Sequence, residues 1–320
     1  MSSIMTNASA MTALKTLQAT NKALETTQAR ISTGYRVGEA SDNAAYWSIA
    51  TTMRSDNKAL STVQDALGLG AAKVDTAYTG MKAAIDVVDE IKAKLVAARE
   101  PGVDRTKIQA EITALQGQLT SNASASTFSG ENWLSVDSSA AGYSATKSIV
   151  ASFTRASDGT VSIGTISVDT SSTKLFDAAA DAAAAGTGIL DGRYDAATGT
   201  LLADQSTGGF TVATLDISAL TNSTADLTTL ENYIKGVDDA ISKMTTAASD
   251  LGAAKKRIDL QTEFVGNLMD TIDRGVGTLV DADMNKESTR LQALQVQQQL
   301  GIQALSMANS NSQSILSLFR

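Results

Sequence analysis

Apolar residues recur every seven positions along two long stretches of the chain. The first stretch spans residues 46–95, and its repeating positions are Tyr46, Met53, Leu60, Leu67, Val74, Met81, Val88 and Leu95. The second spans residues 230–279, with the repeat at Leu230, Val237, Met244, Leu251, Ile258, Val265, Ile272 and Leu279. A heptad pattern sustained for this length predicts coiled-coil helices. Because the two stretches match in length, we expect them to pack antiparallel as a long hairpin.

The two ends of the chain predict a further pair of helices. Residues 3–33 repeat apolar side chains at helical intervals, and Gly34 marks the end of that helix. Residues 291–319 contain no Asp, Glu, Lys or Arg, and their apolar positions alternate with Gln, Ser, Asn and Ala. A helix at a protein surface normally carries a charged face. We therefore expect both terminal helices to be enclosed by other chains, and to become ordered only when those chains surround them.

Shorter signals set the boundaries of the elements between these helices. Ser41 or Asp42 is the expected N-cap of the helix that contains the first heptad stretch, and Pro101-Gly102 ends it. Residues 106–119 predict a shorter helix. The alternating segments 148–154, 160–168 and 210–217 predict β-strands, with a hairpin turn at Asp158-Gly159. Residues 177–208 are rich in Ala and Gly and predict a small outer lobe or a mobile loop.

The predicted fold class is therefore mainly α with a small β-rich insert. Long antiparallel coiled-coil helices come from both ends of the chain, and a β-hairpin region lies in the middle.

Composition narrows the functional classes further. The 320 residues include no Cys, no His, one Pro and few aromatic residues, with a net charge of −8. Disulfides, thiolate chemistry and histidine general bases are excluded. Gly68-Leu69-Gly70 lacks the third glycine of a dinucleotide-binding loop, and the segment after Asp281 lacks the Gly and Glu of a calcium loop. We predict no enzymatic activity, no cofactor and no metal site.

The distribution of charge and of apolar runs also speaks against two kinds of partner. Acidic residues are concentrated in the middle of the chain, whereas nucleic-acid binding requires a basic face. In the tail, Gln and Asn interrupt every apolar run well short of the roughly 18 residues that a membrane span needs. The first residues, MSSIMTNASA, lack the charged start and apolar block of a cleaved signal peptide.

Both ends of the chain resemble bacterial flagellins. Residues 32–50, STGYRVGEASDNAAYWSIA, are similar to the signature that follows the first helix of that family, and SSIMTNASAMTAL is similar to its opening. Residues 281–320, which close with SLFR, resemble its C-terminal module. The resemblance covers roughly residues 1–130 and 225–320.

The resemblance implies a structural subunit that self-assembles into the helical filament of the bacterial flagellum for swimming. Residues 1–40 with 284–320 are then the inner core pair that forms the filament tube. Residues 41–176 with 223–283 are the shell coiled-coil domain with its β-hairpin, and residues 177–222 are a small surface-exposed insert. The expected location is extracellular, after export without a cleaved signal peptide.

The same resemblance implies a set of partners. These are identical subunits in a helical homopolymer, with co-assembly of other flagellins left open, a secretion chaperone on the C-terminal helix, and the filament cap and hook-junction proteins. Neither nucleic acid nor membrane insertion is expected. The expected subunit-interface residues of the inner core are Leu14, Leu17, Leu24, Ile31, Leu291, Leu294, Leu305, Ile315, Leu316 and Phe319.

Two alternative functions are compatible with the sequence. A hook-filament junction adaptor has similar termini but is present in few copies, so long homopolymers from purified subunits separate it from a filament subunit. A pore-forming protein would insert the neutral tail into lipid, and the absence of a continuous apolar run argues against this.

Overall fold

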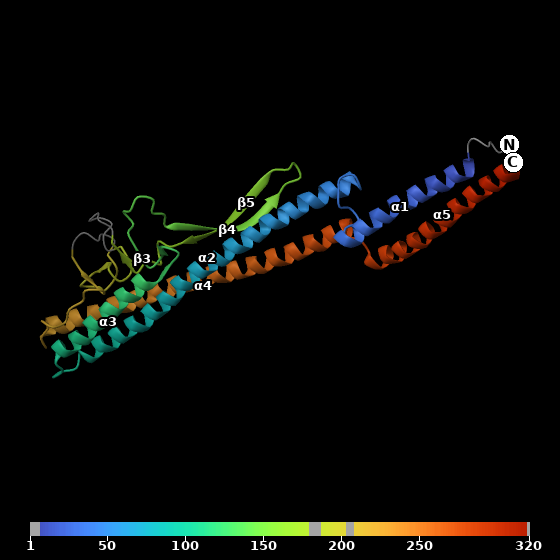
Figure 1. The fold of residues 1–320 in the computed structure, drawn as a ribbon. Coiled ribbons are helices and arrows are strands. Elements are labelled where there is room, and N and C mark those ends of the chain that lie inside the picture. Colours follow the sequence, from blue (N-terminus) through green and yellow to red (C-terminus); the bar gives the residue numbers. More distant parts are fainter. Residues whose placement is uncertain (1–6, 179–186, 203–207, 319–320) are drawn as a thin grey trace. The chain divides into compact units, whose positions relative to one another are not determined.

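The computed structural model describes the backbone of residues 7–178, 187–202 and 208–318, with side chains up to residue 310 in the last range. Five helices and eight strands are found in these residues (Figure 1). The helices are α1 (Ala8–Thr33), α2 (Ala44–Ala97), α3 (Arg105–Ala125), α4 (Thr224–Val280) and α5 (Met284–Leu318). The strands are β1 (Thr127–Phe128), β2 (Glu131–Asn132), β3 (Ser135–Val136), β4 (Thr146–Arg155), β5 (Val161–Asp169), β6 (Phe176–Asp177), β7 (Arg193–Tyr194) and β8 (Phe210–Thr211).

The chain divides into two compact units. One consists of residues 1–58 and 268–320, and the other of residues 59–267. The boundary falls within α2 and again within α4, so each of these helices contributes to both units. We refer to them as the terminal unit and the central unit.

In the central unit, α2 and α4 run antiparallel, as the heptad pattern predicts. Two ion pairs show the direction, because Lys92 on α2 meets Asp238 on α4 whereas Asp75 on α2 meets Lys255 on α4. The heptad positions of both helices are buried in this unit: Leu60, Leu67, Val74, Met81, Val88 and Leu95 on α2, and Leu230, Val237, Met244, Leu251, Ile258 and Val265 on α4. The predicted fold class is confirmed.

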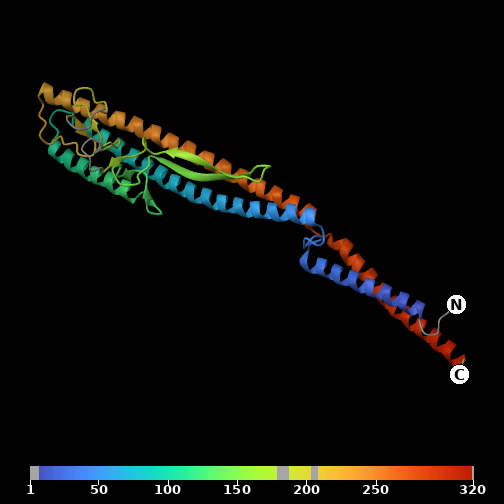
Figure 2. The same cartoon turned by 90° about the horizontal axis from the view of Figure 1, so that it is seen from above.

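A long hairpin formed by β4 and β5 lies beside the helices of the central unit (Figure 2). The strands pair antiparallel from Thr146 and Asp169 to Arg155 and Val161, with a bulge between Val150 and Ser152. Its alternating inward positions are buried, namely Ile149, Ala151, Ile166 and Val168. The turn forms at Asp158-Gly159 as predicted, with Gly159 at a φ of 87°.

The predicted strand at residues 210–217 is mostly not a strand. Only Phe210–Thr211 pairs with another strand. Two glutamines of α3 provide hydrogen bonds to several of the remaining backbone groups. The amide of Gln116 donates to the carbonyls of Val212 and Leu215, at 3.0 and 3.1 Å, and Gln109 accepts from the amide of Ile217 at 2.9 Å. Side-chain amides thus take the place of a neighbouring strand.

The described part of the insert packs around a small core of its own. Tyr194 is fully buried and donates its hydroxyl to the carbonyl of Ile189 at 2.7 Å. Its ring lies 5.9 Å from that of Phe210, which in turn lies 4.5 Å from the ring of Tyr233 on α4. A mobile loop was one of the two predictions for residues 177–208. Residues 187–202 instead form a packed lobe, and residues 179–186 and 203–207 lie outside the described residues.

The heptad pattern fails at the start of α2, in the terminal unit. Tyr46, Ile49 and Met53 were expected in the seam, but they are 41%, 46% and 36% exposed. The buried residue there is Ala50, which forms a cluster with Val37, Val276 and Val280. The N-cap also differs from the expected residues. Asn43 accepts from the amide of Tyr46, because Asp42 is already bonded to the amides of Gly38 and Glu39.

Replacing two glycines of α2 by alanine is expected to have opposite effects on stability. A Cβ at Gly80 would lie 2.6 Å from Leu134 Cδ1 and 2.9 Å from Ser126 Cβ, whereas a Cβ at Gly68 would meet nothing within 4 Å. We expect Gly80→Ala to destabilise the protein by about 1–3 kcal/mol through overpacking. Gly68→Ala should stabilise it by roughly 1 kcal/mol through helix propensity. Urea unfolding of both variants checks this, and equal effects would contradict the packing assigned to Gly80.

Candidate assembly surfaces

Helices α1 and α5 lie side by side and antiparallel in the terminal unit (Figures 1 and 2). Contacts along their length fix the register. Asn7 donates to the carbonyl of Ala308 at 3.0 Å, and Gln298 donates to Asn21 at 2.9 Å. Between these contacts, a Cβ built on Gly301 would lie only 3.2 Å from Leu17 Cδ1, so the helices approach closely at this glycine.

The strip that joins α1 to α5 is built largely from small and polar residues. Thr20 and Thr27 are among the most buried residues of α1, and among the described side chains of α5 the buried large apolar residue is Leu294. The Thr20 hydroxyl donates to the carbonyl of Thr16 at 3.0 Å, so its burial leaves no unpaired donor. Apart from Leu294, the large apolar residues described on the two helices are only half-buried or exposed, so the contact leaves part of their surface in water.

The predicted interface residues occupy different positions on this pair. Leu294 is buried between the helices, Leu14 is 44% exposed, and the half-buried ones are Leu17, Leu24, Ile31, Leu291 and Leu305. Ile315 and Leu316 belong to α5, but their side chains lie outside the described residues. Phe319 also lies outside them. The structure brings the described members together along one pair of helices.

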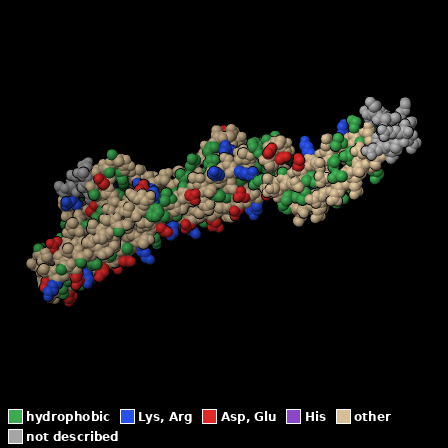
Figure 3. Space-filling view, in the orientation of Figure 1, with side chains coloured by type: hydrophobic (Ala, Val, Ile, Leu, Met, Phe, Trp, Pro, Cys, Tyr) green, Lys and Arg blue, Asp and Glu red, His purple; other side chains and the backbone are tan. Residues whose placement is uncertain are grey.

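Other large apolar side chains, which are not among the predicted interface residues, point away from the pair. Met11 on α1 is 55% exposed, and the exposed ones on the described part of α5 are Met284, Val296, Leu300, Ile302 and Met307. Val296, Leu300 and Met307 are spaced by four and seven residues, so they share one strip of α5 on the side opposite Leu294 and Gly301. We call these three residues the outer strip. Figure 3 shows hydrophobic side chains over this part of the chain, with few charged ones among them.

One buried ion pair joins the two helices near their connection to the rest of the terminal unit. Arg30 Nη1 lies 3.4 Å from Glu287 Oε1, and the Glu287 side chain is only 8% exposed. Arg30 Nε and Glu287 Oε2 are buried without a hydrogen-bond partner. A pair of this kind contributes little net stability, but the buried Glu287 charge without Arg30 would be strongly destabilising. The pair therefore favours the register in which both charges meet.

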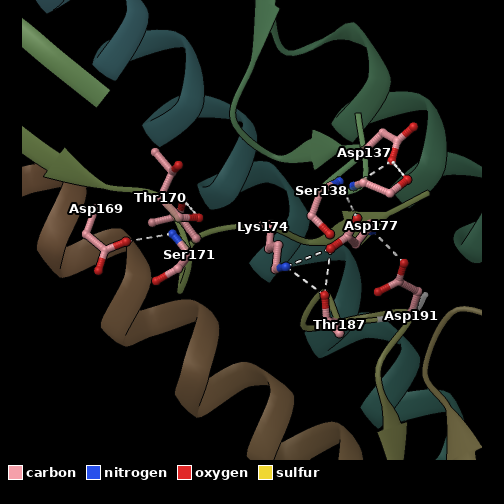
Figure 4. Close-up of polar contacts among 11 residues, drawn as sticks. Asp137, Ser138, Asp169, Thr170, Ser171, Lys174, Asp177, Thr187 and Asp191 are labelled. Atoms are coloured by element: carbon pink, nitrogen blue, oxygen red, sulfur yellow. Dashed lines mark hydrogen bonds and ion pairs between the residues drawn. The ribbon is translucent and has the colours of Figure 1, made fainter. Parts of the chain in front are cut away.

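The central unit contains a buried polar cluster, whose carboxylates are candidates for acid–base chemistry (Figure 4). Asp177 accepts from Lys174 Nζ at 2.7 Å, from the Thr187 hydroxyl at 2.6 Å and from the amide of Ser138 at 2.9 Å. Its own amide donates to Asp191 at 2.6 Å. These bonds tie the segment after β3 to β6 and to the turn before β7.

The electrostatics of the cluster suit a structural role. Burial raises the pKa of Asp177, but the hydrogen bonds from Lys174, Thr187 and Ser138 outweigh it and hold the pKa well below its usual range. Burial raises the pKa of Asp191, and the nearby charge of Asp177 adds to this. The Asp177 carboxylate is already saturated with donors, so it is not available as a general base.

The described residues offer little else that could carry chemistry. No three potential ligands among them lie together in a way that could hold a metal ion. None of the helices in the described ranges has an apolar stretch long enough to cross a membrane. The features that stand out are surfaces, because the terminal unit leaves large apolar side chains in water.

Terminal helices that leave large apolar side chains exposed are typical of subunits that self-assemble through their helices. Comparisons with known proteins agree with this class. Residues 4–139 match the bacterial flagellin N-terminal helical region, and residues 234–319 match the bacterial flagellin C-terminal helical region. The chain is 55% identical over 326 residues to flagellin C of Rhizobium meliloti (strain 1021), with both chains covered in full. Flagellin A of Rhizobium meliloti is 47% identical over 402 residues, and a flagellin of Brucella melitensis biotype 1 is 47% identical over 321 residues, again over the whole of each chain.

The chain belongs to the bacterial flagellin family. It is a structural, non-enzymatic subunit of the extracellular flagellar filament, which serves motility, and it polymerises with identical subunits. Similarity to flagellins along the full length favours the filament subunit over the junction adaptor.

The polar cluster predicts a pH-dependent effect on stability. Because the pKa of Asp177 is lowered by folding, its carboxylate stabilises the folded state above the unfolded pKa of about 4, and this is lost as the pH falls through and below that value. We expect Asp177→Asn to lower the free energy of unfolding by about 2 kcal/mol at pH 7. The difference from the wild type should shrink below about pH 4.

Urea unfolding at several pH values measures this difference. Asp65→Asn, at an exposed position of α2, is the control and should have little effect. A deficit for Asp177→Asn that stays constant with pH would show that the charge of Asp177 is not what stabilises the cluster.

The close approach of α1 and α5 predicts a specific cross-link. The Cβ positions of Leu17 and Gly301 are 3.9 Å apart, which suits a disulfide. The chain has no Cys, so we expect Leu17→Cys combined with Gly301→Cys to form an intrachain bond on mild oxidation. Because we expect the terminal helices to become ordered on assembly, the bond should form faster in filaments than in dilute monomers.

Non-reducing electrophoresis and mass spectrometry follow the bond. Met11→Cys combined with Gly301→Cys is the control, since Met11 is exposed on another face of α1 and should not cross-link within the chain. A disulfide in the control pair but not in the test pair would rule out this register.

Proposed function

We propose that the α1/α5 pair is the part of the subunit that forms the inner tube of the filament, through contacts between neighbouring subunits. On this proposal residues 1–40 and 284–320 form the tube, residues 41–176 and 223–283 form the shell, and residues 177–222 face outward. The supporting observation is the exposure of Val296, Leu300 and Met307 on α5, the outer strip, together with Met11 and Leu14 on α1.

Assembly is favoured by the burial of apolar surface that is exposed on the single chain. Transfer of one Leu or Met side chain from water to a protein interior contributes about 1.5–3 kcal/mol. Within the chain, much of the α1/α5 contact consists of threonines, amides and a glycine approach, so this contribution is largely unrealised. Contacts with neighbouring copies would realise it at every subunit.

The outer strip also supports a proposal about the subunit before it is exported and assembled. An exposed row of large apolar residues on α5 would favour aggregation while the subunit is still in the cell. A secretion chaperone that covers the C-terminal helix would prevent this. The filament cap and the hook-junction proteins are proposed as further partners at the two ends of the polymer.

Leu300→Gln tests the tube proposal, because glutamine preserves helix propensity while removing the apolar contact. Leu300 is 58% exposed, so the stability of the monomer should not change. Loss of about 1.4 kcal/mol per subunit would raise the critical concentration for polymerisation roughly tenfold. We expect short or absent filaments at concentrations where the wild type polymerises, as measured by sedimentation and electron microscopy.

Gln299→Ala is the matched control, because it removes an exposed polar side chain one residue away. It should polymerise like the wild type. Filaments of normal length and critical concentration from Leu300→Gln would exclude the outer strip from the subunit contacts.

A further inference from the structure

The start of α2 and the loop before it carry a second exposed apolar surface in the terminal unit. Tyr35 is 38% exposed, Tyr46 41%, Trp47 37%, Ile49 46% and Met53 36%. We call these five residues the aromatic patch. It is distinct in composition from α1 and α5, because residues 8–33 and 284–318 contain no aromatic residue.

The patch covers adjoining faces of one short stretch of helix. Tyr46, Ile49 and Met53 are spaced by three and four residues and so share one face of α2. Trp47 and Arg54 are seven residues apart and share the neighbouring face. The guanidinium of Arg54 lies over the Tyr35 ring at 4.6 Å, which brings the loop residue to this side of the helix.

Backbone hydrogen bonds hold the patch in place. Tyr35 forms a β-bridge with Asp281, and the amides of Arg36 and Val37 donate to the carbonyl of Val280 at 2.7 and 3.2 Å. On the helix itself, Ala50 is 1% exposed; it lies four residues from Tyr46 and three from Trp47, so the apolar cluster that it forms with Val37, Val276 and Val280 fixes the helix between the two faces of the patch. A surface that is already ordered loses little conformational entropy when it binds a partner.

Two features of the patch are those of a protein interface. Tyr, Trp, Met and Arg are the residue types enriched at the buried centres of interfaces. In addition, Tyr46 and Met53 continue the heptad frame whose members from Leu60 to Leu95 are all buried, yet they remain exposed. Apolar heptad positions that are exposed to solvent are expected where a coiled-coil helix lacks its partner helix.

We propose that the aromatic patch is a contact between subunits, and that its occupant is a second copy of this chain in the filament. The inference rests on the proposed function, because the patch belongs to the same compact unit as α1 and α5. A polymer of identical chains that encloses those helices also brings further copies next to this unit. Trp47 and Tyr46 then act as anchors of the contact, and Ile49 and Met53 pack around them.

The chain carries its own probe for this contact, because it contains two Trp residues. Trp133 is buried, at 3% exposed, whereas Trp47 is 37% exposed. In a Trp133→Phe background, fluorescence reports on Trp47 alone. We expect acrylamide quenching of Trp47 to fall several-fold from monomers to filaments, with a shift of the emission to shorter wavelength. Filaments in which Trp47 is quenched as strongly as in monomers would overturn the proposal.

Substitution gives a second measurement. We expect Trp47→Ala to raise the critical concentration about tenfold, which corresponds to roughly 1.4 kcal/mol, and Trp47→Phe to restore most of the loss. Ser48→Ala, at the exposed neighbouring position, is the matched control and should polymerise normally. Circular dichroism of the monomers verifies folding, and a normal critical concentration for a folded Trp47→Ala protein counts against the proposal.

A photoreactive amino acid at position 47 in swimming cells identifies the occupant directly. This experiment does not require the Trp133→Phe variant, so it remains possible if that variant folds poorly. An adduct of twice the chain mass of 33.1 kDa supports contact with a second copy. An adduct with a different protein, or no adduct in intact filaments, overturns it. Normal polymerisation of Leu300→Gln would refute the proposed function, whereas filaments with an accessible Trp47 would refute this inference alone.

Discussion

The contact between α1 and α5 is made mostly of small and polar side chains, and the rest of the terminal unit follows from this. Thr20, Thr27, Gly301 and the Asn21–Gln298 pair allow the helices to approach closely without requiring much apolar surface. The large side chains that a solitary helical hairpin would place inside are therefore left outside. On the proposed function, the terminal unit gains further hydrophobic stabilisation when neighbouring subunits cover these side chains.

The central unit is organised by the opposite principle. Its heptad positions are buried against each other, its hairpin packs an alternating row of side chains inward, and its insert has a small aromatic core. Such a unit has what it needs to fold before assembly. The chain thus joins a part with a hydrophobic core of its own to a part whose exposed apolar side chains we propose to be covered by neighbouring subunits.

The sequence predicted those features that depend on periodicity or on single residues with strong preferences. The antiparallel α2/α4 pair, the hairpin turn at Asp158-Gly159 and the helix end at Gly34 followed from such signals. The strand expected at residues 210–217 was wrong because Gln109 and Gln116, about a hundred residues earlier in the chain, supply its hydrogen bonds. No local pattern carries that information.

The surface that we propose for assembly was predictable as a region but not residue by residue. A neutral tail indicated burial between chains, and the predicted leucines do lie on the two terminal helices. The outer strip of Val296, Leu300 and Met307 was missed because α5 has apolar residues on two sides, and periodicity alone does not say which side meets α1. Gly301 was the available signal, since a glycine in mid-helix often marks close packing against a neighbouring backbone.

The threonines of α1 have a consequence for how a polymer of this chain can bend. The hydroxyls of Thr12, Thr16, Thr20, Thr26 and Thr33 each donate to the carbonyl four residues earlier in the same helix, at 2.8–3.0 Å. None of these bonds depends on another helix. A neighbour sliding past the exposed ones, Thr12, Thr16, Thr26 and Thr33, therefore breaks none of these hydrogen bonds, so axial strain during rotation can be shared by many small displacements and need not concentrate at one joint.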